Sequence, residues 1–506
     1  MHTKTKSFRK QFPANMATNV ASFIINIVVG LFMVPYYIRH LGVASYGLIP
    51  LATSLTAYLS LIAMALNGAV SRYLVIDIHK NDIASANRVF NTAFFAITTL
   101  ALALIPVGAV LSWYAPHIFS IPANVEGGAK WLFFLSMLSF LVGIITGNFS
   151  VSTYAFNRLD LQNLINISAV VGRTLPVIIF FTLFGAGVQW VGWAFMAGAL
   201  IALSLSVLAW RKLTPFLAIN TRDFDLKKLG QLTNMGWWLT INQVGTLLFL
   251  NTDIIIVNLL FGPEITGKYG AVMQWPMLLR TMAGVFAGVF SPMVLILFAR
   301  GDHEKMLLLC KKSLKFLSLG MALPIGLICG FGGIVLKLWL GPEFTRYSVL
   351  LVIMCAHLSV NLAVLPLFSI QTAANKVRVP GWVTLASGVM MLILALILGK
   401  FTPLGVYGVA LAGAVMLTLK NVVFTPIYAA MILGINKTAF LNPLLGGVTG
   451  TILVWAACVV SSKIVMPGSW ITLIVPSILI SLVYCAGVYF KAINREEKEI
   501  VLSVIG

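Results

Sequence analysis

The stretch Leu250–Gly262 reads LNTDIIIVNLLFG, and it carries a single acidic side chain, Asp253, inside an otherwise apolar run. Such runs recur along the whole chain, which has 506 residues, of which 59% are hydrophobic and only 9% are charged. Ordinary soluble chains carry about 25% charged residues, so a bilayer must supply the apolar surroundings that this chain needs. Because helices satisfy their own backbone groups in lipid, the sequence predicts an all-α polytopic membrane protein.

The apolar runs predict about 14 transmembrane helices, each near the length of about 20 residues that spans a bilayer. The connections between them are short and often contain Gly or Pro, so no extramembrane domain fits between two spans. The expected spans are residues 14–38, 45–67, 87–113, 129–152, 162–184, 189–210, 232–260, 265–298, 307–335, 347–371, 380–399, 404–432, 441–466 and 470–490.

The distribution of Lys and Arg predicts the orientation of the chain in its membrane. If the N-terminus is cytoplasmic, most of the 34 basic residues fall in cytoplasmic segments, as the positive-inside rule requires. Both termini are then cytoplasmic. The net charge of +20 is mainly an orientation signal, so no nucleic-acid partner is expected. The basic start lacks a cleavage site, which favours a retained first helix over a signal peptide.

The sequence also resembles itself after a shift of about 220 residues, which indicates an internal repeat. Chance is the alternative explanation, because Gly and Pro are common in membrane proteins. The matches are Gly42 with Gly262, Gly47 with Gly267, Pro122 with Pro342, AFNR at 155–158 with AANK at 373–376, and Gly187 with Gly405.

A repeat of six helices keeps its orientation, so it predicts two six-helix lobes related by a pseudo-two-fold axis along the membrane normal. Two C-terminal helices are then added to the lobes. The predicted parts are a cytoplasmic N-terminal tail (1–13), an N-lobe (14–212), a cytoplasmic linker (213–231), a C-lobe (232–436), the two added helices (437–490) and a cytoplasmic C-terminal tail (491–506).

Four charged residues lie inside apolar runs, where each costs about 2.5–3.5 kcal/mol at a helix centre. Arg173, Arg280 and Lys420 are the cations, and Asp253 is the acid. They must therefore face one another or water inside the protein. A hydrated cavity with three cations suits an anionic headgroup, because a guanidinium fork matches phosphate oxygens and a lysine adds a compact charge.

Two roles remain open for Asp253. As an ion-coupling residue it would exchange a proton or Na⁺ as the cavity opens and closes. As a structural residue it would bind another buried polar group, and a strained pair with Arg280 is one such arrangement.

Several uncharged polar residues in the spans either line the cavity or form hydrogen bonds between helices. They are Asn19, Asn26, Asn242, Asn251, His357 and Asn361. The histidines and cysteines show no metal-ligand spacing, and neither a catalytic motif nor an ATP-binding motif appears. We therefore expect no cofactor, no metal and no catalytic residue, with transport driven by a H⁺ or Na⁺ gradient or by substrate concentration.

Two longer segments resemble a known family. They are LGVASYGLIPLATSLTAYLSLIAMALNGAVSRYL at 41–74 and NTDIIIVNLLFGPEITGKYG at 251–270, with LWLGPEF further on. Together they resemble the polysaccharide flippase branch of the multidrug/oligosaccharidyl-lipid/polysaccharide (MOP) exporter superfamily, which includes the O-antigen flippases. Members commonly have a basic residue after the acid of this helix, whereas this chain has Ile254.

The resemblance implies that the chain moves undecaprenyl-diphosphate-linked oligosaccharide, such as O-antigen for lipopolysaccharide, from the inner to the outer leaflet of the bacterial inner membrane by alternating access. It also implies membrane lipids and polysaccharide polymerase or assembly proteins as partners. Two alternatives stay open, a multidrug/cation antiporter of the same superfamily and a membrane-embedded glycan-processing enzyme. The antiporter predicts an acidic cavity, and the enzyme predicts a covalent change in the glycolipid.

Overall fold

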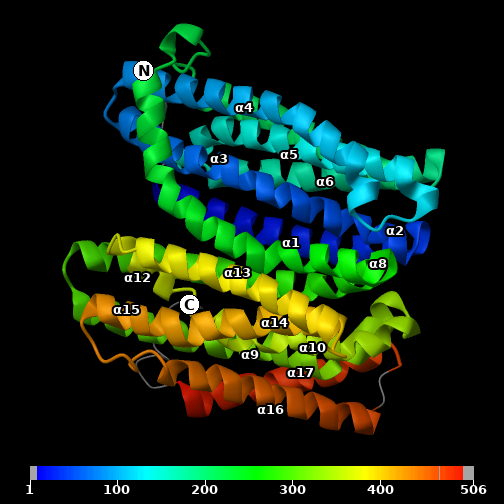
Figure 1. The fold of residues 1–506 in the computed structure, drawn as a ribbon. Coiled ribbons are helices and arrows are strands. Elements are labelled where there is room, and N and C mark those ends of the chain that lie inside the picture. The colour runs from blue at the N-terminus through cyan, green and yellow to red at the C-terminus, as the bar shows by residue number, and fades with distance from the viewer. Residues whose placement is uncertain (1–7, 466–467, 494–506) are drawn as a thin grey trace. The chain divides into compact units, whose positions relative to one another are not determined.

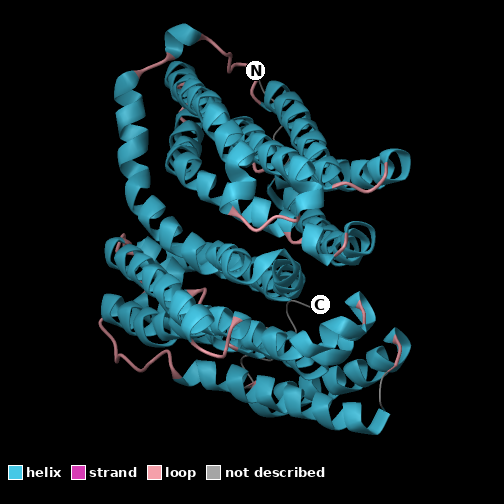
Figure 2. Ribbon diagram, turned by 45° about the vertical axis from the view of Figure 1, so that its right-hand side comes forward, coloured by secondary structure: helices cyan, strands magenta, loops and turns pink. Residues whose placement is uncertain are grey.

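The computed structural model describes residues 8–465 and 468–493, and in this part of the chain all the regular structure is helical (Figure 2). The result follows from the apolar composition, because a lipid-exposed chain must satisfy its backbone groups internally. The predicted all-α polytopic class is confirmed. Most of the two predicted terminal tails lies outside the described residues.

Twelve described helical stretches are long and apolar enough to cross a membrane. One of these stretches, Thr240–Ala299, contains a sharp break at Gly262 and so covers two of the predicted spans. Helix α3 (Leu48–His79) covers the predicted span 45–67 and is not among the twelve, because several of its side chains are not described. The predicted number of fourteen spans stays a prediction.

The chain divides into two compact units, which meet in sequence between Ala271 and Val272 (Figure 1). The first unit contains α1 (Phe8–Leu41), α2 (Val43–Tyr46), α3, α4 (Ile83–Ile118), η1 (Ala123–Val125), α5 (Glu126–Ala155), α6 (Leu159–Phe184), α7 (Val188–Leu213), η2 (Thr221–Asp223) and the first part of α8 (Leu226–Ala299).

The second unit begins inside α8 and runs to the C-terminus. It contains α9 (His303–Leu340), η3 (Pro342–Tyr347), α10 (Ser348–Ala356), α11 (Leu358–Asn361), α12 (Leu367–Ala373), α13 (Arg378–Phe401), α14 (Val406–Leu419), the π-helix η4 (Lys420–Phe424), α15 (Thr425–Leu433), α16 (Asn442–Val465), α17 (Trp470–Gly487) and the π-helix η5 (Val488–Ala492). The predicted lobe boundary in the 213–231 linker comes from the sequence repeat and not from packing, so it stays a prediction.

The chain reverses direction at Gly262, in the middle of α8. The backbone there has φ 78° and ψ −179°, a region that is essentially restricted to glycine. Hydrogen bonds join the two sides of the break, from the Asn258 amide to the Thr266 hydroxyl (3.3 Å) and from the Tyr269 hydroxyl to the Asp253 carboxylate (3.0 Å). A straight helix would hold the last two residues about 24 Å apart, so α8 is a helical hairpin.

Glycine is also required where this hairpin crosses the turn before α3. A Cβ atom on Gly267 would lie 2.0 Å from the carbonyl oxygen of Val43, and one on Gly47 would lie 2.6 Å from the backbone nitrogen of Gly267. The backbones therefore touch directly. The two glycines that the sequence repeat aligns are thus in contact within the first unit.

The repeat of about 220 residues recurs in the backbone conformation of the turns. Asp82 caps α4 by accepting a hydrogen bond from Ser85 N (2.9 Å), and Asp302 caps α9 by accepting one from Lys305 N (3.2 Å). The positive-φ residues also pair at this spacing: Gly42 (79°) with Gly262 (78°), Asn81 (58°) with Gly301 (71°), Asn157 (53°) with Asn375 (54°), and Gly185 (81°) with Gly405 (54°).

One sequence match needs correction. Gly187 has an extended backbone with φ −155°, so Gly185 and not Gly187 is the conformational equivalent of Gly405. Gly185 and Gly187 both belong to the short segment FGAG at 184–187, and the sequence alone does not show which of the two adopts a positive φ.

The hydrophobic cores of the two units follow the same register. In the first unit, Ala86 and Phe90 of α4 are fully buried, and Phe90 stacks on Trp210 with 5.3 Å between ring centroids. In the second unit, Met306 and Cys310 of α9 are fully buried at the equivalent positions. Different side chains are thus buried at positions 220 residues apart, as the repeat predicts.

The Gly262 turn leads to a stability prediction. Open space surrounds the position where a Cβ would be, so Gly262→Ala adds backbone strain without a clash, and we expect it to lower the free energy of unfolding by about 1–3 kcal/mol. Gly284→Ala is the matched control, since Gly284 is helical and equally open; it should be neutral or stabilise by about 0.5–1 kcal/mol. Thermal unfolding in detergent measures both, and equal melting temperatures would contradict the assignment.

Candidate substrate and ion-coupling site

Arg173 lies in the middle of α6 as an exposed cation in an apolar helix of the first unit. Its Cβ packs against α7, where a Cβ added to Gly198 would approach it to 3.0 Å. The guanidinium also interacts electrostatically with the hydroxyl of Tyr37, a buried residue of α1. Gly198 of α7 therefore leaves space for the aliphatic part of the Arg173 side chain. The buried Tyr37 is one of the polar groups that interact with the charge of Arg173.

Arg280 occupies the part of α8 that belongs to the second unit and is half-buried. Its charge acts on His357 and on the Cys355 thiol at the C-terminal end of α10. The structure therefore places two of the predicted site residues, Arg280 and His357, in one neighbourhood of this unit.

Lys420 is half-buried at the first position of the π-helix η4. Its ammonium lies 5.3 Å from the centroid of the Phe368 ring, which belongs to α12. A π-helix adds a residue to one turn and is frequent at functional sites. No sequence signal predicted this local widening.

A buried polar cluster connects α11 to α14 and η4. The Asn361 amide nitrogen is 2.8 Å from His357 Nδ1 and donates to the Thr418 hydroxyl at 2.9 Å. The Asn421 amide donates to the Asn361 carbonyl oxygen at 3.5 Å. Asn361 is only 2% exposed, and its hydrogen bonds join different helices. These contacts correspond to hydrogen bonding between helices, one of the two roles predicted for Asn361. Its role towards a substrate stays a prediction.

Asp253 is half-buried in the first unit and accepts the hydrogen bond from Tyr269 across the α8 hairpin. It also interacts electrostatically with Tyr58 of α3, whose hydroxyl lies 2.5 Å from the Thr252 hydroxyl. Asp253 thus has a structural function at the hairpin. Ion coupling by the same carboxylate stays a prediction.

The four predicted asparagines outside this cluster have different surroundings. Asn19, Asn26 and Asn242 are exposed, and Asn251 is half-buried. The Asn26 amide donates to the Ser22 carbonyl of its own helix at 2.8 Å. None of these contacts tests a role in lining a cavity, which stays a prediction for all four residues.

The charged residues are divided between the units. Arg173 and Asp253 belong to the first unit, and Arg280 and Lys420 belong to the second. Their convergence on one chamber therefore stays a prediction. Among the described residues, no group of three or more His, Cys, Asp or Glu side chains could hold a metal ion.

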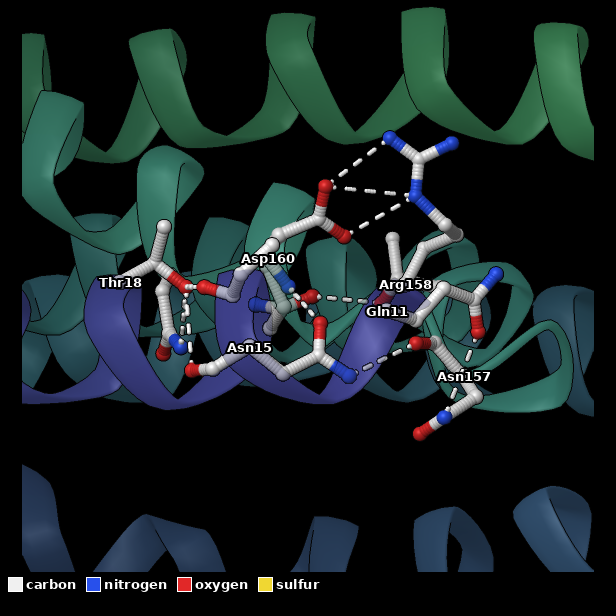
Figure 3. A network of polar contacts seen from close by, with 10 residues as sticks. Gln11, Asn15, Thr18, Asn157, Arg158 and Asp160 are labelled. Carbon is white, nitrogen blue, oxygen red and sulfur yellow. Dashed lines mark hydrogen bonds and ion pairs between the residues drawn. The ribbon is translucent and has the colours of Figure 1, made fainter. Parts of the chain in front are cut away.

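A polar network that sequence analysis did not assign to the site joins α1 to the turn between α5 and α6 (Figure 3). The Asn15 amide donates to the Asn157 carbonyl oxygen (3.0 Å), and the Asn15 side-chain oxygen accepts from Asp160 N (2.9 Å). Arg158 binds the Asp160 carboxylate through Nε at 2.9 Å, and this hydrogen bond raises the pKa of the Arg158 guanidinium. Asn15 therefore holds the positive-φ turn at Asn157 against α1.

Comparison with known proteins adds two relations. The family described as polysaccharide biosynthesis protein matches residues 13–297. The chain is also 31% identical over 492 residues to the "Uncharacterized membrane protein EpsK" of Bacillus subtilis (strain 168), and the match covers 97% of each chain.

Two solved structures have a similar fold. The lipid II flippase MurJ in an inward closed conformation has a TM-score of 0.66 at 14% identity, over 94% of this chain and 99% of that one. An inward-facing multidrug resistance MATE family transporter of the MOP superfamily has a TM-score of 0.61 at 15% identity, over 86% of this chain and 95% of that one. At such identities, these similarities show the fold alone.

The Asn15 network leads to a second stability prediction. Asn15→Ala removes one donor and one acceptor that the turn uses, so the free energy of unfolding should fall by about 1–3 kcal/mol. Asn19→Ala, one helical turn further along and exposed, should change it by less than about 0.5 kcal/mol. Melting temperatures of the two purified variants decide the matter, and a larger loss for Asn19→Ala would refute the assignment.

Proposed function

Since this chain belongs to the polysaccharide biosynthesis protein family, we propose that it is a flippase of the MOP superfamily for lipid-linked oligosaccharide. Its substrate is an undecaprenyl-diphosphate-linked repeat unit of O-antigen or another surface polysaccharide. The protein moves it from the inner to the outer leaflet of the bacterial inner membrane by alternating access. Both termini lie in the cytoplasm, and polysaccharide polymerase or assembly proteins are partners.

The observation that carries this proposal is the set of three cations in apolar helices. Arg173, Arg280 and Lys420 each lie within a candidate membrane span, where a charge is costly unless it serves a function. A diphosphate offers oxygens that two guanidinium forks and one ammonium can bind together. In the transport cycle that we propose, the three cations face one shared hydrated chamber.

The balance of charge favours this function over the export of cationic drugs. A site for cations needs an excess of acidic groups, whereas the mid-span charges identified from the sequence are three cations and the acid Asp253, which already accepts a hydrogen bond from Tyr269. The name of the similar MurJ structure, a lipid II flippase, also supports a lipid-linked substrate. A glycan-processing enzyme would need an external catalytic loop, and the connections between the spans are short.

Arg280→Ala tests the substrate-binding role. Loss of a hydrogen-bonded charge contact should slow translocation by about tenfold or more without reducing expression. Translocation is measured in proteoliposomes as the appearance of a labelled undecaprenyl-diphosphate oligosaccharide in the opposite leaflet. Arg346→Ala is the matched control, because Arg346 is an exposed arginine of η3, near the first residue of the stretch Pro342–Asn361. Wild-type rates for Arg280→Ala would rule out this role.

Asp253→Asn tests ion coupling. The substitution keeps a hydrogen-bond acceptor for Tyr269 but removes the ionisable group, so translocation should lose its dependence on a H⁺ or Na⁺ gradient. Tyr269→Phe provides the complementary control, since it removes the hydrogen bond and keeps the carboxylate. That variant should melt at a lower temperature and keep the gradient dependence. The coupling role fails if Asp253→Asn responds to both gradients as the wild type does.

A further inference from the structure

An apolar cavity of about 430 Å³ lies between α9 and the part of α8 in the second unit. From α8 it is lined by Met282, Phe286 and Phe290, which share one face at i, i+4 and i+8. The α9 wall includes Phe316, Gly320 and Pro324 with the same spacing. None of these residues belongs to the site described above.

Gly320 leaves the α9 wall of this cavity open. It is exposed, and a Cβ added there would meet no atom within 4 Å. Most glycines that stand between packed helices are different, as Gly447 shows: its added Cβ would lie 2.6 Å from Ser318 Cβ. The absence of a side chain at Gly320 therefore widens the cavity and is not needed for close packing.

A lysine precedes the α9 wall of the cavity by one helical turn. Lys312 precedes Phe316 by one turn on the same face of α9, about 6 Å along the helix axis. Lys312 is half-buried, and Lys311 and Lys315 lie beside it in sequence. These lysines follow Asp302, which caps the N-terminal end of α9, in the segment that the distribution of charge assigns to the cytoplasmic side. The wall of the cavity therefore runs from a cationic end into the apolar span.

From this arrangement we infer that the cavity between α8 and α9 binds the polyprenyl tail of a lipid diphosphate, with the phosphates at Lys312. The inference rests on the proposed function and adds to it a loading site, separate from Arg173, Arg280 and Lys420. A lipid diphosphate joins a long apolar chain to a compact anion, and the apolar wall with Lys312 at its end matches both parts.

The lining suits an isoprenoid better than a straight acyl chain. An isoprenoid carries methyl branches and double bonds, so its outline is irregular. Met282 and Met321 provide flexible, polarizable side chains that fill irregular gaps, and the Phe rings provide large apolar faces. The open position at Gly320 admits a branch that a side chain there would exclude.

Filling the cavity tests the inference. Dissociation constants are measured by native mass spectrometry of the full-length protein with undecaprenyl diphosphate, undecaprenol and a phosphatidylglycerol. Gly320→Leu should weaken undecaprenyl diphosphate binding by about tenfold or more, and Gly320→Ala by less. Gly487→Leu is the matched control, because Gly487 of α17 is exposed and equally open; it should bind as the wild type does. Lys312→Ala should weaken the binding of undecaprenyl diphosphate and leave the binding of undecaprenol unchanged. Lys312→Arg should restore the affinity for undecaprenyl diphosphate.

Equal affinity of Gly320→Leu and Gly487→Leu for undecaprenyl diphosphate would overturn the inference. An equal loss of phosphatidylglycerol binding in Gly320→Leu would also overturn it, because the cavity would then be a site for ordinary membrane lipid. If Gly320→Leu does not fold, a photoreactive benzoylphenylalanine replacing Phe316 gives the answer. A cross-link to undecaprenyl diphosphate supports the inference, and a cross-link to phospholipid alone refutes it.

The same variants separate this inference from the proposed function. Suppose that the wild-type protein translocates the oligosaccharide and that Gly320→Leu binds and translocates it equally well. That result would refute the loading site and leave the flippase function intact. A wild-type protein that binds undecaprenyl diphosphate at the cavity without translocating the oligosaccharide would refute the flippase function and keep the binding site.

Discussion

Hydrocarbon offers no hydrogen-bond partner to a peptide group, and the rest of this structure depends on that constraint. The described residues are helical almost throughout, and the chain turns at a few residues with unusual backbone conformations. Where α8 reverses at Gly262, the side chains of Asn258, Thr266, Asp253 and Tyr269 bind across the break. Polar side chains thus bind one another at the point where the helix is interrupted.

Much of the fold could be predicted from sequence because this constraint acts on local patterns. A bilayer-length apolar run must be a helix, so the expected span at 162–184 agrees with α6 to within a few residues. The repeat was visible because its turns need Gly or Asn for a positive φ. The choice between Gly185 and Gly187 was wrong for the same reason, since both residues permit that conformation and only the fold selects one.

The site was less predictable because it depends on contacts between distant segments. The position of Asp253 in an apolar helix indicated that it needs a partner, but the identity of Tyr269 follows only from the reversal of α8. The π-helix at Lys420 has no sequence signature in an apolar run. Asn15 and Asn19 share a helix and a residue type, yet the turn at Asn157 meets only Asn15 through the contacts described. Tertiary structure therefore decides which of two similar polar residues carries a function.

The repeat includes the turns, caps and core positions of the fold but not the charged residues within the spans. Turns, caps and core positions recur after about 220 residues, as Asp82 and Asp302 show at the starts of α4 and α9. The charges in the spans do not recur: at the same shift, Asp253, Arg280, Lys420 and Arg173 correspond to Met33, Ser60, Leu200 and Ile393. Each of these charges is therefore specific to one copy of the repeat, whereas the turns and caps are common to both.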